Sequence, residues 1–216
     1  MALIPFVPNS TFSVAGMTGS GKTQWVYRLL KNLNQMFEDA PPLKVMYCYG
    51  VYQDLYREME ETLSDIIIFH QGLPSQEEIE QFTPDNNHRI IILDDLMSEV
   101  TESKTMQDLF CQFCHHRKIT VIFITQNVFV QGKHARNIAL NTHYFILLKN
   151  MRNHSQIKFL GQQLFPHKSK LLSEAYEDAM KEPYAYLVVD TSPHSTDQFR
   201  VRTHIFPGEY PIVYDL

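Results

Sequence analysis

Apolar and polar residues follow two alternating patterns along this chain. Short apolar runs predict buried strands at 10–15, 43–49, 65–69, 89–95, 119–125 and 143–148. Helices are predicted between them, at 26–37, at 53–63, from residue 75 onward and at 105–116. Strands that alternate with helices indicate βαβ units, so we expect an α/β protein whose mostly parallel central sheet carries helices on both faces.

The last part of the chain has a different pattern. Segments 184–190 and 198–206 predict two strands around a Ser-Pro-His-Ser-Thr-Asp turn, which indicates a C-terminal β-hairpin that extends the sheet. No repeat, low-complexity tract or linker divides the chain. We therefore expect one domain over 1–216, with a core at about 10–182, a hairpin at about 183–206 and a tail at 207–216.

Composition narrows the class of protein. With 216 residues, of which 44% are hydrophobic and 20% charged, the chain is long enough for one well-buried core. No run approaches the length of a membrane span, and the first ten residues lack the pattern of a signal peptide. Three cysteines are too few for a disulfide framework. We expect an intracellular protein that is not secreted and does not enter a membrane.

Eight residues after the first strand match the phosphate-binding P-loop pattern in full, namely Gly16, Met17, Thr18, Gly19, Ser20, Gly21, Lys22 and Thr23. In this pattern backbone N–H groups converge on phosphate oxygens, Lys22 reaches the β- and γ-phosphates, and the Thr23 hydroxyl coordinates Mg²⁺. The loop opens a predicted helix, whose N-terminus favours anions. An accidental match is the alternative, and the correct flanks argue against it. The chain is expected to bind a nucleoside triphosphate along this loop and Gln24.

Two adjacent acids, Asp94 and Asp95, end an apolar strand and form the clearest Walker B candidate. There the first acid can hold Mg²⁺ and the second can orient and deprotonate a water molecule. Side chains of neighbouring strand residues point different ways, which suits two separate roles. The alternative is an acidic cap on the following helix.

A third polar element follows the strand at 119–125. There Gln126 can contact both the γ-phosphate and the attacking water, or it can cap the following loop. In P-loop ATPases of the additional-strand type, this strand lies between the P-loop strand and the Walker B strand. The sequence therefore predicts that strand order.

Several segments together resemble one family. GMTGSGKT, RIIILDDLMSE, HHRKITVIFITQN, GKHARNIALNTHYFILLKN, EAYEDAM and VRTHIF resemble segments of the poxvirus-type DNA packaging ATPases of the FtsK/HerA superfamily, with the nearest match to those of Polinton/Maverick and adintovirus-like elements. The resemblance extends from about residue 10 to about residue 206. The Walker elements are shared with many ATPases, whereas the ITQN strand end and the Arg-Asn-Ile-Ala-Leu-Asn run are more discriminating.

The resemblance implies a RecA-like P-loop ATPase that assembles as a ring of five or six subunits and moves double-stranded DNA into a viral capsid through its portal or vertex. It implies ATP and Mg²⁺ as ligands, with Lys22 and Thr23 on the nucleotide and metal, Asp94 on the metal, Asp95 as base and Gln126 as sensor. Many members of the superfamily carry Glu where this chain has Asp95. A viral protein of this kind would work in the nucleus or cytoplasm of the host cell.

A ring ATPase also needs an arginine finger that reaches a neighbouring subunit's site. Arg117 directly precedes the strand that ends at Gln126, and Arg136 follows that strand in a segment expected to reach a subunit boundary. Arg152 is a weaker third candidate. Each of them can instead be a solvated arginine.

Other signals have a structural interpretation beside the functional one. Cys111 and Cys114 resemble metal ligands, but they continue an apolar helical stripe and are expected to pack. Trp25 and Tyr27 can lie against adenine or in the core. Basic residues alternate along the last predicted strand, and they can contact DNA phosphates or form a solvated face. They are Arg200, Arg202 and His204. A better basic cluster, which suits DNA or a subunit contact, comprises Lys133, His134, Arg136 and Lys149.

Three other classes of function fit parts of the pattern. A helicase or loader of the superfamily 3 or AAA type would bring a DNA-binding or lid domain, for which this chain has little room. A nucleoside or nucleotide kinase of this size would carry an arginine-rich lid. A GTP switch would carry an Asn-Lys-x-Asp motif, which the sequence lacks. The formal net charge of −5 places DNA contacts on local loops rather than over the whole surface.

Overall fold

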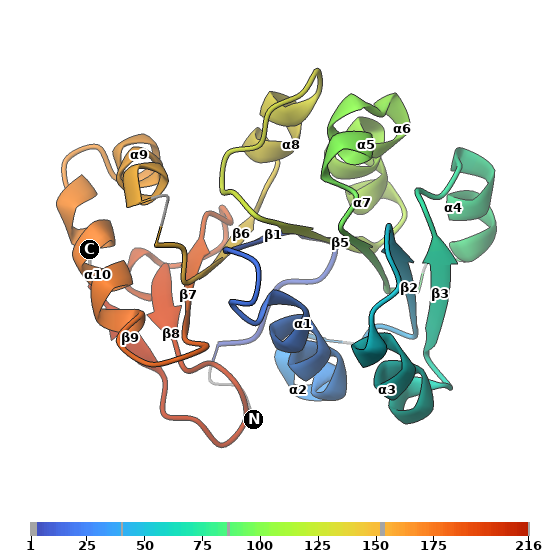
Figure 1. Ribbon diagram of the computed structural model, residues 1–216, viewed down its shortest axis with the longest axis horizontal. Helices are drawn as coiled ribbons and strands as arrows, with labels where there is room; N and C mark the ends of the chain where they lie inside the picture. The colour runs from blue at the N-terminus through green and yellow to red at the C-terminus, as the bar shows by residue number, and fades with distance from the viewer. Residues whose placement is uncertain (1–3, 40, 86, 152–153, 216) are drawn as a thin grey trace.

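The computed structural model describes residues 4–39, 41–85, 87–151 and 154–215. The strands in these ranges are β1 Thr11–Ala15, β2 Lys44–Tyr49, β3 Ile67–Gln71, β4 Arg89–Asp94, β5 Ile119–Thr125, β6 Tyr144–Leu148, β7 Tyr186–Asp190, β8 Val201–Thr203 and β9 Ile212–Tyr214. They form one sheet in the order β3-β2-β4-β5-β1-β6-β7-β8-β9 (Figure 1).

The strand order confirms the main expectation from the sequence. Strands β3, β2, β4, β5, β1 and β6 are parallel, and β5 lies between β1 and β4. Because parallel strands end at the same edge, the P-loop after β1 meets the ends of β4 and β5 there. The fold is therefore the α/β P-loop fold of the additional-strand type.

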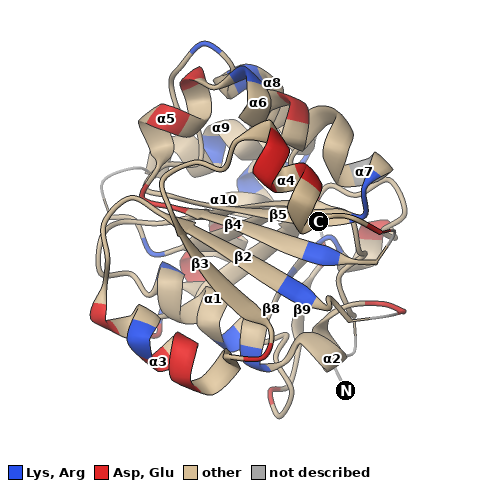
Figure 2. Cartoon of the chain, turned by 90° about the vertical axis from the view of Figure 1, so that its right-hand side faces the viewer, with Lys and Arg blue, Asp and Glu red and all other residues tan. Residues whose placement is uncertain are grey.

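Helices cover both faces of the sheet (Figures 1 and 2). One face carries α1 Lys22–Lys31, α2 Leu33–Met36 and α3 Asp54–Leu63. The other carries α4 Gln76–Phe82, α5 Met97–Glu102, α6 Lys104–Asp108, η1 Leu109–Phe113, α7 Cys114–His116, α8 Ala135–Leu140, α9 His154–Leu164 and α10 Ser169–Ala179. A short η2 Asp197–Phe199 precedes β8. Among the described residues, no helix has the length and apolarity to cross a membrane.

Side-chain alternation along the strands decides which residues meet which helices. On β4, Ile90 and Ile92 pack toward α1 and α3, whereas Ile91 and Leu93 pack toward α5 and α6. The same alternation directs the side chain of Asp94 toward α1.

The first helix is shorter than the sequence pattern predicts. It breaks at Asn32, whose φ of −120° is not helical, and resumes as α2. The Asn32 side chain donates a hydrogen bond to the Arg28 carbonyl at 2.8 Å, so it competes with the backbone for a helical acceptor. Phe37 then leaves the helix in an extended conformation and forms a bridge with Phe6.

The predicted helix at 105–116 contains a π-helical turn, η1, between two α-helical pieces. Cys114 is buried and its thiol donates to the Phe110 carbonyl at 3.2 Å, while Cys111 is half-buried near the side-chain amide of Asn141. The packing interpretation of Cys114 is confirmed.

The C-terminal hairpin is present, but its strands are shorter than predicted and a third strand follows. β7 pairs antiparallel with β6 and with β8, and β9, within the expected tail, pairs antiparallel with β8. Both interpretations of Arg202 are wrong. Its side chain is 1% exposed and pairs with the 2% exposed carboxylate of Asp190 at 3.1 Å, so it neither contacts solvent nor follows phosphates.

We expect Arg202→Ala to lower the free energy of unfolding by about 3 kcal/mol, because it leaves the Asp190 carboxylate buried without its ion partner. Urea denaturation measures this loss. Lys181→Ala, which removes an exposed ion pair with Asp178, is the matched control and should change stability little. Equal effects of the two substitutions would show that the Arg202 pair does not stabilise the pairing of β7 with β8.

Candidate active site

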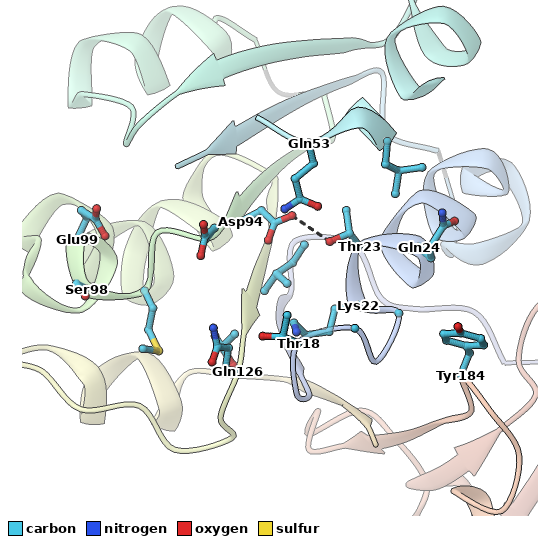
Figure 3. Close-up of a pocket in the computed structure, with 17 residues that line it drawn as sticks. Thr18, Lys22, Thr23, Gln24, Gln53, Asp94, Ser98, Glu99, Gln126 and Tyr184 are labelled. Carbon is cyan, nitrogen blue, oxygen red and sulfur yellow. Dashed lines mark hydrogen bonds between the residues drawn. The ribbon is translucent and has the colours of Figure 1, made fainter. Parts of the chain in front are cut away.

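A cleft of about 710 Å³ lies at the edge where the parallel strands end. This is a typical size for a small-molecule site. Figure 3 shows side chains from the P-loop, β4, α5 and the segment after β5 around it. The residues that line it include Thr18, Lys22, Thr23, Gln24, Gln53, Asp94, Asp95, Ser98, Glu99, Gln126 and Tyr184.

The P-loop glycines serve two different purposes. A Cβ atom on Gly16 would lie 2.6 Å from Ser20 Oγ and 2.9 Å from Leu148 Cβ, so the loop closes over this residue without room for a side chain. Gly19 and Gly21 have φ angles of +79° and +95°, which side chains disfavour. These conformations direct the chain into α1, whose first residue is Lys22.

The Lys22 ammonium lies within the loop, where it donates to the carbonyls of Gly16 at 2.8 Å and Met17 at 3.0 Å. Burial lowers its pKa, and the charges of Asp94 and Asp95 oppose that shift. The side chain is thus held at the loop by neutral carbonyls, which a phosphate can replace as the stronger partner.

Asp94 is 4% exposed, and its Oδ2 atom accepts three hydroxyl hydrogen bonds. They come from Tyr47 at 2.7 Å, Tyr56 at 3.0 Å and Thr23 at 3.3 Å. Burial raises the pKa of Asp94 above its usual value, whereas these hydrogen bonds and the Lys22 charge lower it. The three donors therefore stabilise the ionised form that a metal ligand needs.

Sequence reasoning missed both tyrosines. Burial and the nearby Asp94 charge raise the pKa of Tyr47 and of Tyr56, so both remain protonated donors. Their rings pack against each other and against Phe69. A tyrosine within a central apolar strand is a usable signal, because a buried hydroxyl needs a partner. Which group is the partner of the Tyr47 hydroxyl cannot be read from the sequence, because it depends on the pairing of β2 with β4. That pairing places the β2 residue Tyr49 directly beside Asp94.

Asp95 has the opposite environment. It is exposed, and its backbone has a φ of +55°. Its carbonyl oxygen also approaches Gly50 so closely that a Cβ there would clash. A non-glycine residue in this conformation stores strain, which concentrates at functional positions. The expectation that the two acids point different ways is confirmed.

Gln126 follows the last residue of β5 and is exposed at the cleft, where Figure 3 shows its side chain near Lys22 and Thr18. Its carbonyl accepts from the Asn150 side chain at 3.2 Å. This contact ties the end of β5 to the segment after β6 and leaves the Gln126 amide directed into the cleft.

The side chains present fit Mg²⁺. Thr23 and Asp94 supply hydroxyl and carboxylate oxygens 3.3 Å apart at the cleft, and Asp95 adds a second carboxylate nearby. Mg²⁺ prefers such oxygen ligands and takes few of them from protein, because it keeps waters and substrate phosphates. Thr23 and Asp94 are the residues that would hold it.

The arginine candidates lie in different places. Arg117 lies between α7 and the start of β5, so it is at the opposite edge of the sheet from its own P-loop, and it pairs with Glu80 at 2.9 Å. Arg136 is exposed in the first turn of α8. Arg152 lies outside the described residues. No arginine lines the cleft within the described part of the chain.

The aromatic residue at the cleft is not one that the sequence analysis named. Trp25 and Tyr27 are 5% and 2% exposed in the core, so neither lies against a base. Tyr184, 73% exposed, lines the cleft instead. Of the proposed basic cluster, Lys133 and Arg136 are exposed beside or within α8, whereas the Lys149 carbonyl accepts from the Met17 backbone at 3.3 Å.

Comparisons with known proteins agree with the fold. The chain resembles the genome packaging NTPase B204 from Sulfolobus turreted icosahedral virus 2, solved in complex with ATP-gammaS, with a TM-score of 0.58 and 11% identity over 91% of this chain and 97% of that one. A second similar structure is EssC (ATPases 2 and 3) from Geobacillus thermodenitrificans, at a TM-score of 0.49 and 12% identity over 95% of this chain and 39% of that one. No protein-family model and no curated protein matches the sequence. The first likeness confirms a P-loop NTPase fold.

We expect Tyr47→Phe to shift the acid limb of Mg²⁺-dependent nucleotide hydrolysis to higher pH. The pKa of Asp94 is already raised by burial, and the ionised form is lost as pH falls through it. Removing a hydrogen bond that lowers this pKa moves that loss to higher pH. The measurement is the hydrolysis rate against pH at fixed Mg²⁺.

Tyr49→Phe is the matched control. Tyr49 lies on the same strand and in the same aromatic cluster, but its hydroxyl does not bond Asp94. Identical acid limbs in the two variants would contradict a role for the Tyr47 hydroxyl.

Proposed function

We propose that this chain is an ATP-hydrolysing motor that moves double-stranded viral DNA into a capsid. The observation that carries the proposal is the single cleft that brings together Lys22, Thr23, Asp94, Asp95 and Gln126. The fold likeness to a viral genome packaging NTPase and the sequence resemblance to the poxvirus-type packaging ATPases of the FtsK/HerA superfamily support it.

In the proposed reaction the triphosphate lies along the P-loop. Lys22 exchanges its carbonyl partners for phosphate oxygens, and Thr23 and Asp94 are the residues that would hold Mg²⁺. When bound, Mg²⁺ supplies neutralisation of the charge on the phosphate oxygens. Asp95, whose side chain is exposed at the cleft, accepts the proton of the attacking water, and Gln126 orients that water. The products are ADP and inorganic phosphate.

Water is the acceptor that this arrangement favours. Asp95 and Gln126 are exposed at the cleft, at the ends of two adjacent strands. Both can therefore reach a small molecule at the γ-phosphate. A kinase would need a second binding site for its acceptor, and the polar residues here converge on one place.

A neighbouring subunit completes the proposed site. Arg117 is engaged by Glu80, whereas Arg136 is exposed on α8. The His134 backbone bonds the Thr101 carbonyl of α5 at 2.8 Å, which positions the start of α8 near the helix that follows the two acids. We therefore favour Arg136 as the finger in a head-to-tail ring.

DNA, the capsid and the host cell enter the proposal through the family resemblance. Lys133 exposes positive charge just before α8, and such a residue can contact phosphates in a protein whose net charge is −5. The ring would dock at the capsid portal or vertex. Its place of action would be the nucleus or cytoplasm of the host.

We expect linear duplex DNA to stimulate ATP hydrolysis by the wild-type protein, and native mass measurement to find a ring.

Lys22→Ala should abolish nucleotide binding, because the phosphates lose their cation. Asp95→Asn should bind ATP normally but not hydrolyse it, because the amide cannot accept the proton. Binding is measured by calorimetry and turnover by phosphate release.

Several outcomes would contradict these assignments. Wild-type turnover in Asp95→Asn would exclude Asp95 as the base. Phosphate transfer to a nucleoside without DNA stimulation would identify a kinase instead. ATP hydrolysis stimulated by single strands alone, with strand separation, would identify a helicase.

We expect Arg136→Ala to bind ATP and form the ring yet lose most of its turnover, by roughly 10³-fold, the lower bound for an arginine finger. The measurement is hydrolysis in rings that mix wild-type and variant subunits. If Arg136 acts in the neighbouring subunit's site, a variant subunit lowers the hydrolysis rate of its wild-type neighbour, although the nucleotide site of the variant subunit itself is intact. Arg117→Ala is the comparison, and the reverse ranking of the two variants would assign the finger to Arg117.

A further inference from the structure

Tyr184 is an aromatic side chain exposed at the P-loop cleft. It is 73% exposed and its backbone φ is +58°, a left-handed conformation that non-glycine residues seldom adopt. Both features are unfavourable in the absence of a ligand, since the ring remains in water and the backbone is strained. Strain of this kind persists at ligand sites.

The surrounding structure holds Tyr184 in place. Tyr186, two residues later, is buried in β7, where its ring packs against Trp25 and Phe206 and its hydroxyl donates to Glu209 at 2.8 Å. On the other side, Met180 is buried where α10 ends, and Pro183 restricts the backbone before Tyr184. The ring is therefore presented by a short connection anchored at both ends.

The ring of Tyr184 lies close to the P-loop backbone. A Cβ atom on Gly21 would lie 3.1 Å from Tyr184 Cδ1, so the ring approaches the residue that precedes Lys22. In Figure 3 Tyr184 and Gln126 stand on opposite sides of Lys22. If the γ-phosphate lies toward Asp95 and Gln126, the base end of the nucleotide points toward Tyr184.

We propose that Tyr184 is the platform on which the nucleobase stacks, an inference that rests on the proposed nucleotide site. An aromatic face binds any base through its π-surface, so the contact does not distinguish adenine from guanine. It favours purines over pyrimidines, because the larger base covers more of the ring. The selectivity at this position is thus for base size.

The test compares ligands with and without a base. Tyr184→Asn removes the ring but keeps a residue that tolerates positive φ. We expect it to bind ATP and GTP roughly tenfold more weakly than wild type, the size of one base stack. Binding of inorganic tripolyphosphate should not change. Tyr184→Phe should bind ATP like wild type, and Tyr210→Ala, at an exposed tyrosine outside the cleft, is the surface control.

Fluorescence gives a second readout. The chain has a single tryptophan, Trp25, which is buried in the core. We expect Tyr184→Trp to show quenched emission when ATP is added and no change with tripolyphosphate.

The outcomes separate this inference from the proposed function. Equal loss of ATP and tripolyphosphate in Tyr184→Asn would overturn it, because the ring would then act through the loop. Unchanged ATP binding in that variant, with binding still abolished by Lys22→Ala, would also overturn it and leave the proposed function standing. Unchanged ATP binding in Lys22→Ala would instead remove the nucleotide site itself.

Discussion

The hydrogen bond between Thr23 and Asp94 connects α1, the helix that follows β1, to β4, a strand that does not pair with β1. Thr23 lies in the first turn of α1, after β1, and Asp94 ends β4, with β5 between the two strands. The bond forms because the strands are parallel and end together, and because Asp94 shares the α1 face of β4 with Ile90 and Ile92. A shift of one residue in the register of β4 would turn Asp94 toward α5 and break its hydrogen bond with Thr23.

That constraint gives the two adjacent acids different environments. Asp94 is buried among three hydroxyl donors, which fix the orientation of its carboxylate at the wall of the cleft. Asp95 follows after a reversal of the backbone to positive φ and remains exposed. Holding a metal requires a rigid ligand, whereas accepting a proton requires access to the reacting water. The strained backbone at Asp95 therefore allows two adjacent residues to meet these two different requirements.

Much of this arrangement could be predicted from the sequence because it depends on local patterns. The P-loop and the acids at the end of β4 follow from motif spacing and from continuous apolar runs, whereas the central place of β5 is expected from the strand order of P-loop ATPases of the additional-strand type. Tyr47 and Tyr184 could not be found in this way, since the position of Tyr47 depends on strand register and Tyr184 lies on a connection far beyond the P-loop in the sequence. For Arg202, by contrast, the sequence pattern indicates an environment that the structure shows to be wrong. Its alternating pattern is typical of a solvated face, and only the position of Asp190 on the paired strand explains its burial.

The hydroxyl groups around Asp94 also bear on how the site can cycle. A buried carboxylate without them would be neutral more readily, because burial alone raises its pKa. With Tyr47 and Tyr56 in place, the charge is stabilised by buried hydroxyl groups that already point at the carboxylate, so little reorganisation would be needed for a metal to bind. The opposite wall of the cleft has no comparable support, since Asp95, Ser98, Glu99 and Gln126 are exposed. One wall of the cleft is therefore fixed by hydrogen bonds, and the other is open on the side of the exposed acids, which is where the proposed contact from a neighbouring subunit and the proposed attacking water would lie.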